Sequence, residues 1–245
     1  MDRRTFGIGA TGALLSGAKA VAAAPAARLD GPRRPPARAP ARYLIVLLHG
    51  FGSNGDDMIG LVPEFQPYAP TAAFAAPNAT HAMGGGSYSW FTPQPQGQAN
   101  RDTEQARAAR AAAGGGPALD AFIDAELARY NLAPERLILL GFSQGASTVL
   151  NSGLRLKTQP AAIIAFSGNN LSPAGLARTG RRTPVLLIQG DQDDRVTAAG
   201  QRQSMAVLKD IGSPATAHIL PGLGHDIDDR GIKLAGELIR SVTQG

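Results

Sequence analysis

The stretch RLILLGFSQGASTVL, residues 136–150, places Ser143 between two glycines where an apolar run gives way to a helical pattern. The run at 137–140 is unbroken, which is typical of a strand buried on both faces. A serine at a strand–turn–helix junction is the setting of a nucleophile elbow, where flanking glycines leave room for a strained turn. The alternative is that Ser143 is merely a small residue in an ordinary connection. The rest of the chain must distinguish the two.

Short apolar runs alternate with helical patterns from residue 43 to residue 242. This alternation predicts a single α/β domain with a doubly wound, mostly parallel sheet. The expected strands cover residues 43–48, 72–76, 136–140, 161–166, 185–189 and 216–220. The expected helices cover residues 56–62, 117–130, 145–156, 198–211 and 228–242. A Gly-, Pro- and Gln-rich stretch at 81–102 breaks the rhythm and is expected to be a long loop.

The charge of the chain is concentrated at its start. The net charge is +5, and the first 40 residues account for all of it, with seven basic and two acidic groups. The remainder has no net charge, which argues against a nucleic-acid partner. The chain has no cysteine, which excludes disulfides, thiolate catalysis and cysteine metal sites.

Residues 1–27 have the layout of an export signal. A basic start with Arg3 and Arg4 precedes a short apolar run and small-residue cleavage sites, and the arginine pair resembles a twin-arginine signal. A membrane anchor is the alternative, but the run is too short and glycine-rich. We therefore expect a bacterial protein that meets the export machinery, becomes periplasmic or secreted, and keeps no stable membrane anchor after signal removal. Residues 28–41, RLDGPRRPPARAPA, predict a disordered linker, and residues 42–245 the catalytic domain.

A serine nucleophile requires a base, and the base requires an orienting acid. In a nucleophile-elbow fold these follow the serine in the order acid, then histidine. Three carboxylates, Asp191, Asp193 and Asp194, follow the expected strand at 185–189, and His225 follows the one at 216–220. Because the carboxyl ends of parallel strands meet at one edge of a sheet, these groups are expected to lie close to Ser143.

Two backbone N–H groups are candidates for an oxyanion hole. One belongs to Gln144, which follows the nucleophile, and the other to Phe51 in the loop LLHGFGSNGDD after the first strand. Only the backbone of Gln144 is needed for this role. His49 is expected to brace the same loop by hydrogen bonding. No two histidines have the spacing of a metal-ligand pair, so the sequence predicts neither a metal nor a cofactor.

Together these stretches resemble the phospholipase/carboxylesterase family of serine α/β-hydrolases, which includes acyl-protein thioesterases and small bacterial carboxylesterases. The resemblance implies an α/β-hydrolase fold without a large cap, with Asp193 as the acid. It also places Trp90 and Phe91 near the site, where they either contact substrate or simply pack the core. The matching stretches are LLHGFGSNGDDM (47–58), APN (76–78), WF (90–91), LILLGFSQGA (137–146), FSG (166–168), QGDQDDRV (189–196) and GLGHDI (222–227).

The resemblance implies a serine carboxylic-ester hydrolase that acts through Ser143, Asp193 and His225 and an acyl-enzyme. The expected substrates are small-molecule esters with small or medium acyl groups. A thioesterase or lysophospholipase acting on lipid-derived substrates is an alternative; a serine peptidase or a binding protein with a decayed site fits less well. The inserts HAMGGGSYS (81–89) and AAAGGGP (111–117) depart from the family pattern and leave the pocket shape open. The sequence gives no basis for an oligomeric state.

Overall fold

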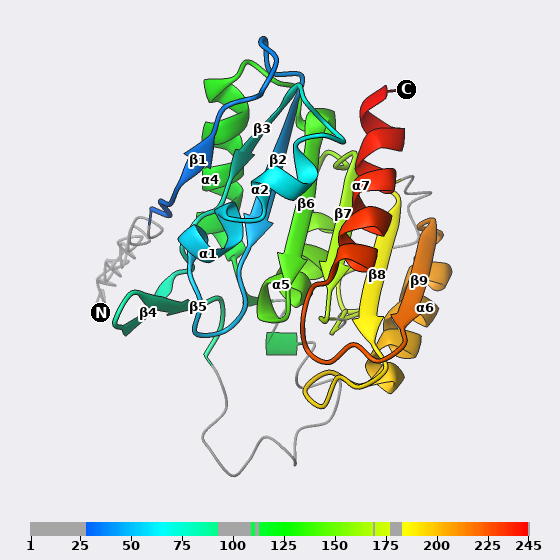
Figure 1. Cartoon of the computed structure of the whole chain (residues 1–245). Helices are drawn as coiled ribbons and strands as arrows, with labels where there is room; N and C mark the ends of the chain where they lie inside the picture. The colour runs from blue at the N-terminus through cyan, green and yellow to red at the C-terminus, as the bar shows by residue number, and fades with distance from the viewer. Residues whose placement is uncertain (1–27, 93–108, 111–112, 169, 177–182, 245) are drawn as a thin grey trace, which may run out of the picture.

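The computed structural model describes residues 28–92, 109–110, 113–168, 170–176 and 183–244 (Figure 1). The expected export signal, residues 1–27, lies outside the described residues, as does much of the expected 81–102 loop.

A seven-stranded sheet, in the order β1-β3-β2-β6-β7-β8-β9, forms the centre of the molecule. All neighbouring strands are parallel except β1, which runs antiparallel to β3. The mostly parallel α/β sheet predicted from the sequence is therefore confirmed. The strands are β1 (Arg33–Arg34), β2 (Tyr43–Leu48), β3 (Ala72–Ala75), β6 (Leu137–Phe142), β7 (Ala162–Phe166), β8 (Val185–Gly190) and β9 (Ala215–Leu220).

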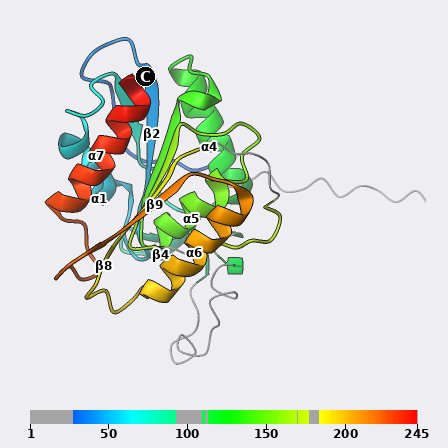
Figure 2. The same cartoon turned by 90° about the vertical axis from the view of Figure 1, so that its right-hand side faces the viewer.

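Helices cover both faces of this sheet (Figure 2). One face carries α4 (Gly116–Arg129), α5 (Gln144–Gly153) and α6 (Ala198–Ile211), and the other carries α1 (Gly55–Ile59), α2 (Val62–Phe65) and α7 (Asp229–Gln244). A short 3-10 helix, Pro134–Arg136, leads into β6. No helix among the described residues is both long and apolar enough to cross a membrane.

Alternate residues of the central strands enter two separate cores. In β2, Leu44 and Val46 pack with the α4 and α5 side, whereas Ile45 and Leu47 pack with the α1 and α7 side. A strand buried on both faces needs apolar residues at every position, which explains the unbroken runs in the sequence. The polar residues that follow each strand are left at the carboxyl edge.

Part of the expected 81–102 loop is a hairpin, formed by β4 (His81–Gly84) and β5 (Ser87–Ser89). Its turn is possible because Gly84, Gly85 and Gly86 all have positive φ angles, which are available to glycine without steric cost. The hairpin lies beside the loop after β2: the N–H of Gly52 donates to the carbonyl of Tyr88 at 3.0 Å.

Residues 28–41 belong to the folded domain, so the prediction of a disordered linker there is wrong. The two residues of β1 pair with β3, and Leu29 is buried. The Arg33 guanidinium lies 2.8 Å from the carboxylate of Glu126, which is buried on α4. Pro and Arg give no strand or helix periodicity, and the buried partner lies 93 residues further along the chain. The composition of the segment therefore conceals its anchoring.

Candidate active site

Ser143 lies on the turn between β6 and α5, with φ of 54° and ψ of −114°. Neighbouring backbone crowds this turn. A Cβ on Gly145 would lie 2.1 Å from the carbonyl oxygen of Leu48, and one on Gly141 would lie 2.4 Å from that of Gly145. Both flanking positions therefore require glycine, as the nucleophile-elbow interpretation predicts.

Ser143, His225 and Asp193 come together at the carboxyl edge of the sheet. His225, in the loop between β9 and α7, has Nε2 2.9 Å from Ser143 Oγ and Nδ1 2.9 Å from Asp193 Oδ2. The side chain of His225 is 10% exposed and that of Asp193 is fully buried. Because an ionised carboxylate only accepts hydrogen bonds, Nδ1 carries the proton and Nε2 accepts from the serine hydroxyl.

Of the three carboxylates after β8, Asp193 alone contacts His225 in the part of the chain that the structure describes. Its other oxygen accepts the N–H groups of Arg195 and Val196, each at 2.9 Å. Burial by itself would raise the pKa of Asp193, but the bonds from His225, Val196 and Arg195 outweigh it and hold that pKa below its usual value. The carboxylate therefore stays ionised beside the imidazole.

Asp191 has a different role. Its Oδ1 accepts the N–H of Gly222 at 2.7 Å, and its own N–H donates to the carbonyl of Leu220 at 3.1 Å. Asp191 thus ties the loop that carries Asp193 to the loop that carries His225.

The loop after β2 lies against the nucleophile. A Cβ on Gly50 would lie 3.3 Å from the Cβ of Ser143. The N–H groups of Phe51 and Gln144 have no acceptor among the described residues, and Gln144 opens α5, where the helix dipole gives positive potential. Both amides are thus available to a ligand beside Ser143.

His49 braces this loop from behind, as expected. It is fully buried, and its Nε2 accepts the N–H of Ala79 at 3.1 Å, so Nδ1 carries the proton and donates to the carbonyl of Gly50 at 2.7 Å. Burial lowers the pKa of His49, and the Gly50 carbonyl only partly opposes this. His49 is therefore held neutral.

Neither Trp90 nor Phe91 lines the cavity beside Ser143, so that cavity does not support a substrate contact for this pair. Trp90 is 1% exposed, packs beside the His49 ring and donates from Nε1 to the His49 carbonyl at 2.9 Å. Phe91 packs against the same core from a half-buried position. For Trp90, these contacts agree with the core-packing alternative.

The cavity that does contain Ser143 and His225 has a volume of about 310 Å³. Its apolar walls come largely from positions that sequence reasoning missed. Met58 and Leu61 fall inside an expected helix, and nothing in the sequence shows that this helix lies over the sheet edge. The apolar lining consists of Phe51, Met58, Leu61, Phe142 and Ile227, and the polar lining includes Ser53, Asp57, Arg195 and Asp226.

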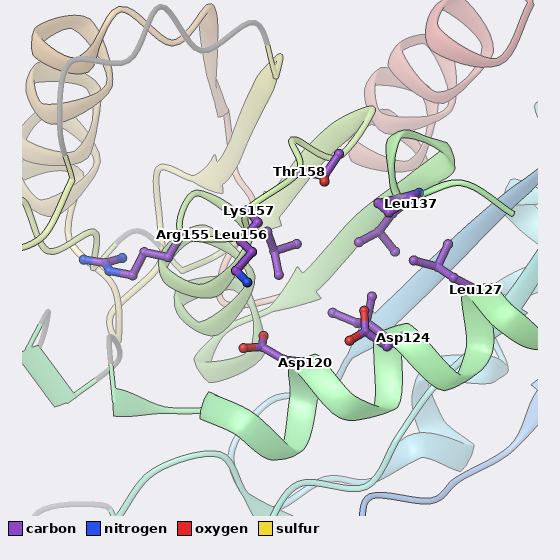
Figure 3. Close-up of a pocket in the computed structure, with 10 residues that line it drawn as sticks. Asp120, Asp124, Leu127, Leu137, Arg155, Leu156, Lys157 and Thr158 are labelled. Atoms are coloured by element: carbon purple, nitrogen blue, oxygen red, sulfur yellow. The ribbon is translucent and has the colours of Figure 1, made fainter.

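A second cavity, of about 470 Å³, opens at the opposite end of the sheet, beside the start of β6 (Figure 3). Asp120 and Asp124 of α4 line it together with Arg155 and Lys157. Burial, with a smaller contribution from the Asp124 charge, raises the pKa of Asp120. Neither serine nor histidine lines this cavity, so it is not a site for a serine nucleophile.

No group of His, Cys, Asp or Glu side chains suited to a metal ion occurs among the described residues.

The chain is similar to known esterases over most of its length. Esterase YpfH of Escherichia coli K12 is 31% identical over 210 residues, which cover 82% of this chain and 83% of the relative. Acyl-protein thioesterase 1 of Neurospora crassa is 26% identical over 216 residues, covering 79% of this chain and 85% of the relative. The crystal structure of esterase PE8 superposes with a TM-score of 0.79 and 41% identity, covering 88% of this chain and 99% of that one.

The family model for phospholipase/carboxylesterase matches residues 35–243, nearly the whole described part of the chain. With the elbow, the histidine and the acid at one sheet edge, this match identifies the chain as a hydrolase of the phospholipase/carboxylesterase family, with an α/β-hydrolase fold.

Proposed function

We propose that this protein is a serine carboxylic-ester hydrolase that acts through Ser143, His225 and Asp193. The observation that carries the proposal is the continuous hydrogen-bonded chain from Ser143 Oγ through the imidazole to Asp193, with 2.9 Å at each step. A serine hydroxyl is a weak nucleophile until a base takes its proton, and these distances suit that transfer.

In the proposed reaction, Ser143 Oγ attacks the ester carbonyl carbon while His225 Nε2 takes the hydroxyl proton. The carbonyl oxygen becomes an oxyanion, which the amides of Phe51 and Gln144 bind. The C–O bond to the alcohol then breaks, and the imidazolium returns the proton to the leaving oxygen. Water, activated by His225, attacks the acyl-enzyme and releases the acid. Asp193 holds the imidazole and stabilises its charge in both halves.

The cavity supports esters with small or medium acyl groups. Its apolar walls at Met58, Leu61 and Ile227 suit a hydrocarbon chain, and its volume of about 310 Å³ limits the length of that chain. Thioesters are the second candidate, because the similarity to acyl-protein thioesterase 1 extends over 79% of this chain and the same triad cleaves both bonds. A lysophospholipase activity on lipid-derived esters is a third.

The test is hydrolysis of p-nitrophenyl esters of increasing acyl length, with acyl thioesters and a peptide substrate in parallel. Wild type should cleave short and medium esters and be labelled by a fluorophosphonate. Ser143→Ala should lose both properties, with a fall in kcat of roughly 10⁵- to 10⁶-fold. Equal ester hydrolysis by wild type and Ser143→Ala would refute the triad. Faster turnover of thioesters or of the peptide would reassign the substrate class.

We also propose that the protein is exported to the periplasm or beyond. The support is the sequence of residues 1–27, with Arg3 and Arg4 ahead of a short apolar run. In a bacterial host, Arg3→Lys with Arg4→Lys should abolish export, and N-terminal sequencing of the exported form should begin near residue 28. Full-length protein retained in the cytoplasm of the wild-type strain would contradict this.

A further inference from the structure

The side chain of Gln144 is buried and bonded to three consecutive residues. Gln144 Oε1 accepts the N–H of Trp90 at 2.8 Å, and Nε2 donates to the carbonyl of Phe91 at 3.0 Å and to Ser89 Oγ at 3.1 Å. The Ser89 hydroxyl in turn donates to the Phe91 carbonyl at 2.6 Å. Both N–H bonds of the amide are used, so its orientation is fixed.

These residues belong to a bridging segment, residues 88–91, which also holds the loop after β2. Tyr88 exchanges backbone bonds with this loop: its carbonyl accepts from Gly52 at 3.0 Å, and its N–H donates to Ser53 at 2.9 Å. Trp90 Nε1 donates to the carbonyl of His49 at 2.9 Å. The loop is therefore attached to the bridging segment both before and after Phe51.

The two amides assigned to the oxyanion hole lie on separate elements, Phe51 on this loop and Gln144 at the start of α5. Donors stabilise an oxyanion when they lie about 2.7–3.1 Å from it, and misplacement by about 1 Å can cost about 10²-fold in rate. The bridging segment joins the two elements by hydrogen bonds and does not line the cavity beside Ser143.

We propose that the Gln144 side chain is a positioning residue, which acts through the bridging segment to set the spacing of the Phe51 and Gln144 amides. The proposal rests on the proposed function and assigns a task to a side chain that the reaction itself does not use. Gln144 thus serves twice: its amide binds the oxyanion, and its side chain aligns the other donor.

The principal test is Gln144→Met, which keeps the backbone amide and the side-chain length but removes all three bonds. It should lower kcat by about 10- to 100-fold and change KM by less than about 3-fold, because the substrate does not touch this side chain. The Ki of an alkyl trifluoromethyl ketone, which forms a charged tetrahedral adduct, should rise by the same factor by which kcat/KM falls. Gln144→Glu should not restore activity, because its carboxylate cannot donate to the Phe91 carbonyl.

Trp90 is the only tryptophan in the chain, so selectively excited tryptophan fluorescence reports on the bridging segment alone. Gln144→Met should shift the emission of Trp90, because the backbone N–H of Trp90 loses its acceptor, Gln144 Oε1. Gln201→Met is the matched control: Gln201 is also a buried glutamine, on α6, and donates to the carbonyl of His218 at 3.4 Å. This variant should keep wild-type kcat, inhibitor affinity and emission.

A folded Gln144→Met enzyme with wild-type kcat and Ki would overturn the proposal, even if its unfolding midpoint fell. A rise in KM equal to the fall in kcat/KM would also overturn it, since that indicates direct substrate contact. If Gln144→Met does not fold, Ser89→Ala replaces it, with an expected fall in kcat of about 3- to 10-fold at unchanged KM; unchanged kcat refutes the proposal. Failure of the proposed function looks different, because Ser143→Ala would then retain ester hydrolysis.

Discussion

His225 Nε2 lies 2.9 Å from Ser143 Oγ, although 82 residues separate the two along the chain. The contact exists because β6 and β9 end at the same edge of a parallel sheet, and a polar segment follows each strand there. The buried strands fix the positions of the loops, and hydrogen bonds within the loops orient the side chains.

The choice of Asp193 as the acid can be tested against its neighbour Asp191. Asp193→Asn should lower kcat by roughly 10⁴-fold, because an amide at this position favours the wrong imidazole tautomer. Asp191→Asn keeps an oxygen to accept the N–H of Gly222 and should retain activity within about 3-fold. Steady-state ester hydrolysis measures both variants. A larger loss in Asp191→Asn than in Asp193→Asn would reverse the assignment.

His49 should make stability depend on pH. Burial lowers its pKa in the folded state, so the unfolded chain binds a proton near pH 6.5 that the folded chain does not. The unfolded state therefore gains stability as pH falls below about 6.5, and the free energy of unfolding declines by up to about 1.4 kcal/mol per pH unit from this group. His49→Gln removes the proton site, so its stability deficit should shrink between pH 8 and pH 5. Urea denaturation at both pH values measures the deficit, and an equal deficit at pH 8 and pH 5 would contradict this prediction.

Gly145 should not tolerate a side chain. A Cβ there would lie 2.1 Å from one backbone carbonyl oxygen and 2.5 Å from the next, of Leu48 and His49, so Gly145→Ala should destabilise by about 3 kcal/mol or more and abolish activity. Gly153→Ala, on the same helix, meets only the flexible ends of Ile163 and Leu139 at 2.8 Å and should change stability by about 1 kcal/mol or less. Chemical denaturation of both variants gives the comparison. Similar stabilities would show that the elbow backbone adapts.

The segment before β2 should contribute to stability through Arg33. Its partner Glu126 is 2% exposed, whereas Arg33 is 27% exposed and Arg129 offers a second cation. Removing Arg33 leaves a buried carboxylate only partly compensated, so Arg33→Met should cost about 1–3 kcal/mol. Arg34→Met, the exposed neighbour in β1, should cost less than about 0.5 kcal/mol. Equal thermal stabilities of the two variants would show that the ion pair contributes nothing.

The sequence was sufficient for the parts of the molecule that follow from local pattern. Unbroken apolar runs located β2, β3, β6, β7 and β8 to within two residues, because a strand buried on both faces consists almost entirely of apolar residues. The edge strand β9 was located as closely, although most of its residues are not buried. Glycines at 141 and 145 marked the elbow because backbone fills the space that a side chain would need. The order of Ser143, the three candidate carboxylates and His225 followed from the strands that precede them, and the family resemblance selected Asp193.

Local pattern failed where the deciding partner is distant in the chain. Residues 28–41 resemble a linker in composition, and only the buried carboxylate of Glu126 shows why Arg33 is fixed. Gly84–Gly86 indicated a loop, whereas pairing of the flanking residues makes a hairpin. The family pattern places Trp90 near the site, whereas the structure buries it against the ring of His49.

The sequence by itself thus determined the fold class, the elbow and the order of Ser143, three candidate carboxylates and His225, because each depends on residue type and on order along the strands. The tertiary structure decided which residues line the cavity beside Ser143 and what holds the loop after β2. Those depend on contacts such as Gln144 with Trp90, 54 residues apart, and no local periodicity encodes a contact between a helix start and a hairpin end. For Ser143, the flanking glycines established a strained turn, and the tertiary structure placed a base and an acid within hydrogen-bonding distance.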